Sequence, residues 1–162
     1  LLLYSQQKMF KLKEDIRVFS DEAMTAELLH IQARQVIDFS AAYDVVDSTY
    51  QTKVGVLRRK GLRSMMRDEW EVLDANDQLI GILQEDSIGY ALLRRLLLGS
   101  LLPQNYDLLI NSQPVADLKQ RFRLFGYHLD LDFSMDTGRQ LDRRLGIAAA
   151  ILLGTIEGKQ RS

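Results

Sequence analysis

LGIAAAILLGTI, at residues 145–156, is the stretch of the chain that decides the fold. It carries no charge and only one hydroxyl group, and charged residues stand on both sides of it. As a helix it would be only about 18 Å long, because each residue adds about 1.5 Å, and a bilayer core needs about 20 apolar residues. A helix that is apolar all round is buried in protein or in lipid. We therefore expect a helix that is buried inside the protein, and no transmembrane span.

The composition fits one folded domain over residues 1–162. The chain has 162 residues and a formal net charge of −1, so no global field attracts nucleic acid or an anionic membrane. We expect no nucleic-acid partner, and only local attraction to lipid. Cysteine is absent, which excludes a disulfide framework, a thiol nucleophile and a cysteine zinc site. The first residues lack the regions of a secretory signal peptide, and we expect a cytoplasmic protein that is peripheral where it meets a membrane.

Short apolar segments alternate with polar turns along most of the chain, which predicts repeated β-hairpins. Three units share one pattern: an aromatic residue, a charged residue and an apolar pair, then a polar turn and a second apolar segment. These units are 43–47 with 53–57, 70–74 with 80–83, and 106–110 with 115–118; residues 16–29 form a looser copy and 122–133 a further hairpin. Asn76-Asp77 and Asn111-Ser112 tolerate the positive φ of tight turns. A solenoid is less favoured, because the spacing between the units drifts.

A second apolar stretch, residues 88–103, has the composition and length of a helix and ends at Pro103. Arg94 and Arg95 lie on one side of this helix, and leucines fill most of the rest. We expect an additional helix at 88–102 that packs on the outside of a sheet. The alternative is a helix that lies in a membrane interface, although two basic residues make a thin polar side for that role.

Together these patterns predict a mainly β fold, in which antiparallel hairpins close into a barrel around the C-terminal helix. Closure removes the edges of a sheet, and the lumen must then be filled. Gly146, Gly154 and the alanines at 148–150 keep the helix slim enough to lie inside a ring of strands. The aromatic residues that open the three repeated units are Tyr43, Trp70 and Tyr106, and we expect them in the core.

The residues before the apolar stretch predict where its helix begins. Thr137 can cap the helix, with Gln140 three residues later as its capping-box partner. Asp136 and Asp142 lie near the positive end of the helix dipole, where negative charge is favoured.

The hairpins and the helix are arranged as in a known family. The pattern Tyr/Trp-x-Val-x-Asp-turn-x-Gly-x-Leu, a later Tyr-x-Leu-x-Ile-turn-Pro-Val-Ala unit and a final Asp-Arg-Arg-Leu helix resemble the LURP-one-related family, over about residues 4–157. That family is grouped with phospholipid scramblases and the Tubby C-terminal domain. The resemblance implies a barrel of about twelve strands around a central C-terminal helix, but no settled activity. Tubby domains bind phosphoinositides through basic residues, and scramblases are associated with lipid movement and calcium.

Two groups of basic residues are candidate sites for anions or anionic lipid. The denser group is Arg58, Arg59, Lys60, Arg63 and Arg67. The second is Lys119, Arg121 and Arg123, which alternate and would therefore share one face of a strand. Clustered cations attract phosphate groups even on a nearly neutral protein. The plainer alternatives are a solvated hairpin end for the first group and the outer face of a barrel strand for the second.

The sequence predicts no catalytic, metal or cofactor site. Asp130, Asp132 and Asp136 precede the final helix, but they lack the converging turn of a calcium loop. His30 and His128 are the only histidines, and neither belongs to a recognised catalytic motif. Nucleophile elbows and phosphate-binding glycine loops are also missing.

We therefore expect a non-enzymatic binding or scaffold domain that recognises anionic phospholipid head groups or a membrane-associated protein partner. One alternative is a barrel that binds a small apolar ligand beside its helix, although the helix takes the space where such barrels keep a cavity. The other is an enzyme of unrecognised type, for which a deep pocket with converging titratable groups would be the sign.

Overall fold

The computed structural model describes residues 3–7, 15–34, 41–60, 69–85, 105–121 and 128–160. Ten strands and one helix lie within them. They are β1 (Tyr4–Gln7), β2 (Asp15–Phe19), β3 (Glu27–Ala33), β4 (Ala42–Asp47), β5 (Thr52–Arg59), β6 (Glu69–Leu73), β7 (Leu79–Glu85), β8 (Asn105–Ile110), β9 (Gln113–Arg121), β10 (His128–Asp132) and α2 (Arg143–Gln160). Each strand pairs with the next along the chain, so one antiparallel sheet runs in order from β1 to β10. The mainly β prediction is confirmed.

The repeated sequence units are hairpins of this sheet. The pairs β4–β5, β6–β7 and β8–β9 correspond to the three units, and β2–β3 corresponds to the looser copy. Asp77, Asn111 and Ser112 have φ angles of 64°, 49° and 63°, as tight hairpin turns require. β10 lies in the second half of the hairpin predicted at 122–133 and pairs with β9, whereas the first half of that hairpin, residues 122–127, lies outside the described residues. The repeat therefore reflects a meander of paired strands and not a solenoid.

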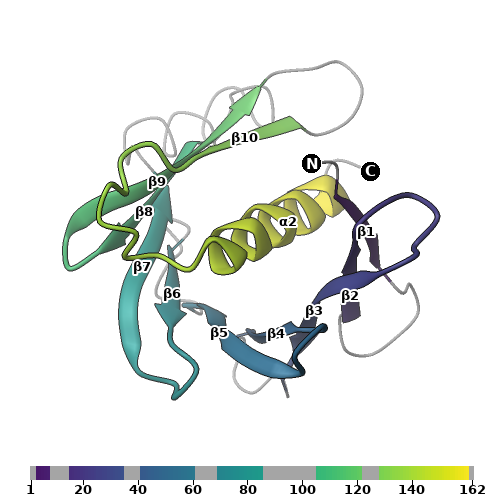
Figure 1. Ribbon diagram of the computed structural model, residues 1–162. Coiled ribbons are helices and arrows are strands. Elements are labelled where there is room, and N and C mark those ends of the chain that lie inside the picture. Colours follow the sequence, from purple (N-terminus) through teal and green to yellow (C-terminus); the bar gives the residue numbers. More distant parts are fainter. Residues whose placement is uncertain are drawn as a thin grey trace.

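The sheet curves around α2, which lies across its hollow side (Figure 1). Side chains alternate between the two faces of a strand, and those on the inner face are buried with the helix. From α2, the core cluster takes Leu145, Ala148, Ala149, Leu152 and Leu153. The predicted burial of the C-terminal helix inside the protein is confirmed.

The aromatic residue that opens each repeated unit packs in this core. Tyr43, Trp70 and Tyr106 are 5%, 2% and 0% exposed. The ring centroids of Tyr43 and Trp70 lie 5.9 Å apart with the planes tilted by 36°, which is a favourable distance for two aromatic rings. The prediction that these residues serve the core is confirmed.

The predicted closure into a barrel is not shown. Pairing starts at β1 and ends at β10, and nothing within the described ranges pairs these two strands with each other. The described sheet has ten strands, where the resemblance implied about twelve. The helix predicted at 88–102 lies outside the described residues. In the part of the chain that is described, no helix is both long and apolar enough to cross a membrane.

The helix α2 begins after the predicted cap, so the prediction for Thr137 is wrong. Asp142 is the residue that caps it: its carboxylate accepts a hydrogen bond from Arg144 N at 3.0 Å, and its carbonyl accepts one from Leu145 N at 2.9 Å. The segment around Thr137 is instead a separate turn, in which the buried carboxylate of Asp136 accepts bonds from the backbone N–H groups of residues 140 and 141, at 2.8 and 3.1 Å. A short polar side chain can cap either a turn or a helix, and local sequence does not distinguish the two.

Candidate functional site

The first predicted group of cations lies at the end of the β5–β6 ladder. Arg58 Nε and Nη2 lie 2.6 and 2.5 Å from Oε2 of Glu71, the cross-strand partner of this arginine. Lys60 pairs with Glu69 and also lies 4.0 Å from Glu71. The side chains of Arg58 and Lys60 are 46% and 42% exposed. Each cation is therefore open to solvent but has a carboxylate beside it, which weakens its pull on another anion.

Arg59 points to the opposite face of β5 from Arg58, because side chains alternate along a strand. Its guanidinium carbon lies 5.9 Å from the ring centroid of Trp70, within the range of a cation–π contact. Arg63 and Arg67 lie outside the described residues. Two of the five predicted cations thus share the outside of this strand end with two glutamates, so the charges there balance, and Arg59 lies on the opposite face.

In the second predicted group, Lys119 and Arg121 are exposed on the outside of β9, with the buried Gln120 between them. Lys119 pairs with Asp117, and Arg121 pairs with Asp130 of β10. The hydrogen bond and the charge of Asp117 raise the pKa of Lys119 above its ordinary value. Arg123 lies outside the described residues.

Carboxylates outnumber cations on this face of β8, β9 and β10. Asp107, Asp117 and Asp132 are cross-strand partners in one row, and Asp130 adds a fourth carboxylate. Like charges in directly opposed positions repel each other. Among the described residues, four carboxylates against Lys119 and Arg121 leave an excess of two negative charges on this face, where the alternation predicted a basic stripe. The aspartates were visible in the sequence, but only the strand register shows that they are neighbours.

The three aspartates before α2 do not converge on one point. Asp132 accepts bonds from the backbone N–H and the hydroxyl of Ser134, at 2.8 and 3.0 Å. Asp130 instead pairs with Arg121 of β9. Burial raises the pKa of Asp136, but its bonds from residues 140 and 141 outweigh burial and hold the pKa below the ordinary value. Over the described ranges, no three His, Asp or Glu side chains are grouped to hold a metal ion.

A polar hollow that no sequence pattern indicated lies over β2, β3 and the β4–β5 turn. Its volume is about 320 Å³, and it is lined by Arg17, Glu27, His30, Val46, Ser48 and Gln51. Of these lining residues, His30 has its Nε2 at 2.8 Å from Asp15 Oδ1. Glu27 accepts bonds from Arg17 Nη1 at 2.6 Å and from Ser48 Oγ at 2.7 Å. These side chains come from separate strands, so their spacing along the chain carries no recognisable signal.

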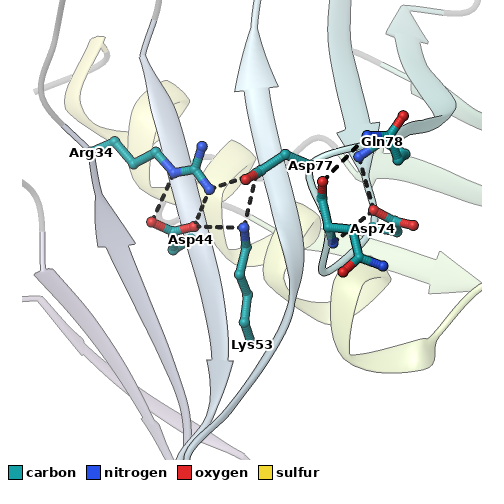
Figure 2. A network of polar contacts seen from close by, with 7 residues as sticks. Arg34, Asp44, Lys53, Asp74, Asp77 and Gln78 are labelled. Atoms are coloured by element: carbon teal, nitrogen blue, oxygen red, sulfur yellow. Dashed lines mark hydrogen bonds and ion pairs between the residues drawn. The ribbon is translucent and has the colours of Figure 1, made fainter.

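A second polar cluster ties the β6–β7 turn to β4 and β5, and Figure 2 shows it. Arg34 donates to both oxygens of Asp44, at 2.9 and 2.7 Å, and to Asp77 at 2.6 Å. Lys53 Nζ donates to the same oxygen of Asp77 at 2.9 Å. Bonds from Lys53 and Arg34 lower the pKa of Asp77, and the bond to Asp44 is the main cause of a raised pKa for Arg34. These charges satisfy one another, which favours a clamp on the turn over a ligand site.

Comparison with known proteins gives one match. The family described as LURP-one-related matches residues 1–154. No curated protein and no solved structure matches the chain. The matched residues include all ten described strands and the first two thirds of α2.

Proposed function

The chain belongs to the LURP-one-related family, and from this premise we propose that it is a non-enzymatic binding domain that recognises anionic phospholipid head groups. The observation that carries the proposal is the position of α2 in the hollow of the sheet (Figure 1). Its buried leucines and alanines fill the hollow of the sheet, which in lipocalin-like barrels is the space that holds a ligand. A binding surface is therefore sought on the outside of the sheet, and a small apolar ligand in the interior has less support.

The charge distribution favours one outer surface over the other. On the outside of the β5–β6 end, Arg58 and Lys60 are balanced by Glu71 and Glu69, whereas the described residues around Lys119 and Arg121 have two excess negative charges. A basic residue at an anionic membrane surface contributes about 1 kcal/mol, and a neighbouring carboxylate reduces that contribution. We assign lipid attraction to Arg58 and Lys60, and none to the β9 residues.

The proposed attachment is weak, peripheral and cytoplasmic. Arg58 and Lys60 already have a carboxylate partner, so an anionic head group must compete for them. Exposed charge pairs are screened by salt over a Debye length of about 8 Å at physiological ionic strength. Binding should therefore fall steeply as salt is raised.

The test is co-sedimentation with lipid vesicles, either of phosphatidylcholine alone or with added phosphatidylserine, at low and high salt. We expect binding only with phosphatidylserine and only at low salt. The variant Arg58→Gln/Lys60→Gln should lose about tenfold in partitioning, less than the roughly 30-fold that two unpaired cations would contribute at about 1 kcal/mol each. Circular dichroism and thermal melting check that this variant is folded.

The matched control is Lys119→Gln/Arg121→Gln, which removes two cations from the face with excess carboxylates. We expect its partitioning to equal that of the wild type. Equal losses in both variants would show that only net charge matters, and binding that is independent of phosphatidylserine would contradict the proposal. A membrane-associated protein partner would then be the better reading of the same domain.

A further inference from the structure

We propose that the polar hollow over β2–β4 is a binding site for a neutral polyhydroxylated molecule of about monosaccharide size. The inference does not rest on the proposed lipid binding, because it uses none of the same residues. It rests on the lining of the hollow: three titratable side chains, a hydroxyl, an amide and one aliphatic side chain around about 320 Å³. Binding sites for small molecules begin at about this volume and place a few polar groups with fixed geometry.

The lining is held in place by a chain of hydrogen bonds. Asp15, which is 7% exposed, fixes the ring of His30 at 2.8 Å. The Nε of Arg17 lies 3.5 Å from the same oxygen of Asp15, and its Nη1 donates to Glu27 at 2.6 Å. Ser48 Oγ donates to the other oxygen of Glu27 at 2.7 Å. A ligand therefore meets side chains whose conformations are already set, which lowers the entropy cost of binding.

The charges of the hollow oppose a charged ligand of either sign. Burial raises the pKa of Glu27, but the bonds from Ser48 and Arg17 and the charge of Arg17 outweigh it, so the pKa lies below the ordinary value and the group is a carboxylate at neutral pH. An anion entering the hollow meets this carboxylate, and a cation meets the guanidinium of Arg17. The two groups are already paired at 2.6 Å, so a charged ligand that is attracted by one of them is repelled by the other. A neutral ligand leaves the pair intact.

The remaining hydrogen-bonding groups suit hydroxyls. In the described part of the chain, Arg17 bonds through Nη1 and approaches Asp15 with Nε, so its Nη2 remains as a donor. Because Asp15 occupies His30 Nε2, the other ring nitrogen, Nδ1, is left for a ligand. Gln51 uses its Nε2 on the carbonyl of Ser48 at 2.7 Å and keeps its amide oxygen. A hydroxyl can both donate and accept, so a polyol can form hydrogen bonds with both the donors and the acceptors of the hollow. Val46 adds an apolar surface that can contact the carbon atoms of such a ligand.

The histidines of the chain provide the probe. There are only two, His30 in the hollow and His128 on β10, so ring signals in a ¹³C–¹H NMR spectrum report on the site and on a remote control at once. We would titrate the protein with methyl glucoside, myo-inositol, inorganic phosphate and ethanolamine. We expect saturable shifts of the His30 signals with at least one neutral polyol, at the millimolar affinity typical of so small a ligand. The His128 signals should not move.

Paired variants make the test decisive. Ser48→Ala/Gln51→Ala removes two polar groups from the lining of the hollow, and we expect about a tenfold loss of affinity. The control Ser112→Ala/Gln113→Ala makes the same two changes at the exposed β8–β9 turn and should leave affinity unchanged. The two variants are matched in backbone strain as well, because each changes one residue with a positive φ, Gln51 at 54° and Ser112 at 63°. The proposal is overturned if no polyol gives a saturable shift below about 100 mM, if both variants respond alike, or if phosphate or ethanolamine binds more tightly than the polyols.

Discussion

The ring of Phe133 occupies the space that a side chain on Gly146 would need. A Cβ built on Gly146 would lie 2.5 Å from Cε1 and 2.6 Å from Cζ of Phe133. The guanidinium carbon of Arg143 lies 4.4 Å from the centroid of the same ring, in a cation–π contact. The glycine therefore lets the segment after β10 pack directly on the first turn of α2, at a point where the helix enters the hollow of the sheet.

We predict that Gly146→Ala destabilises the protein, although alanine favours helix. The helix gains about 1 kcal/mol from the better propensity, but a methyl group forced into a filled space costs about 1–3 kcal/mol. We expect a net loss of about 1 kcal/mol in the free energy of unfolding, measured by urea denaturation. Gly138→Ala is the control, because a Cβ there meets only Gln140 side-chain atoms at 3.6 and 3.8 Å. Equal stability of the two variants would mean that Phe133 moves aside without cost.

We predict that Ala149→Asp prevents stable folding. Ala149 is 1% exposed and belongs to the core cluster, so the new carboxylate would be buried without a partner. An uncompensated buried charge costs about 3–5 kcal/mol, a large part of the total stability of a small domain. The measurement is thermal melting followed by circular dichroism. Ala75→Asp introduces the same change at an exposed turn position and should melt like the wild type; a cooperatively folded Ala149→Asp protein would show that α2 is not the core.

Asp142 should be the residue on which the start of α2 depends. Its carboxylate accepts from Arg144 N and pairs with the Arg144 guanidinium at 2.6 Å, and that guanidinium also reaches Asp47 of β4 at 2.6 Å. Loss of a helix cap costs about 1 kcal/mol, and we expect this loss for Asp142→Ala in urea denaturation. Thr137→Ala is the control and should have almost no effect. A larger loss of stability for Thr137→Ala than for Asp142→Ala would show that Thr137, the residue suggested by the sequence, caps the helix.

The charge of Asp142 should matter only above acidic pH. The hydrogen bond from Arg144 is the largest cause that holds the pKa of Asp142 below its ordinary value of 3.8. The unfolded chain therefore binds the proton more tightly, so the stabilisation is complete above about pH 4 and is lost as the pH falls through the folded pKa. Asp142→Asn, which keeps a capping oxygen, should be less stable than the wild type at pH 7. At pH 3 this difference should shrink, and a constant difference across the range would rule out the charge as its cause.

The clamp in Figure 2 should restrain the β6–β7 turn. Asp77 has a φ of 64°, and asparagine tolerates that region, so Asp77→Asn removes the charge without straining the backbone. We expect faster hydrogen exchange at Gln78 N and Asp74 N, which close the turn, with a small loss of overall stability because exposed ion pairs contribute little. The difference in exchange rate between the variant and the wild type should become smaller at high salt. Equal exchange rates at low salt would show that the turn is stable without these ion pairs.

Local pattern was enough to predict the hairpins and the buried helix. Alternating apolar residues, turn residues such as Asp77 and Asn111, and an uncharged run at 145–156 act over a few residues, and the structure has strands, positive φ angles and a buried helix at those places. The helix cap was not predictable in the same way, because Asp136, Thr137 and Asp142 are all suitable capping residues. Which one caps α2 depends on where the chain can enter the sheet beside Phe133.

By itself, then, the sequence determined an antiparallel meander and an apolar helix that must be covered, since periodicity and turn chemistry are local and burial of apolar surface is not directional. Only the tertiary structure decided how the charges are distributed. Arg144 meets Asp47 across 97 positions of the chain, and the row of Asp107, Asp117 and Asp132 exists only in the register of β8 to β10. The same is true of the hollow around His30, whose groups come from separate strands. Electrostatic and hydrogen-bonding sites depend on distances of a few ångströms between remote residues, and those distances are a property of the folded sheet.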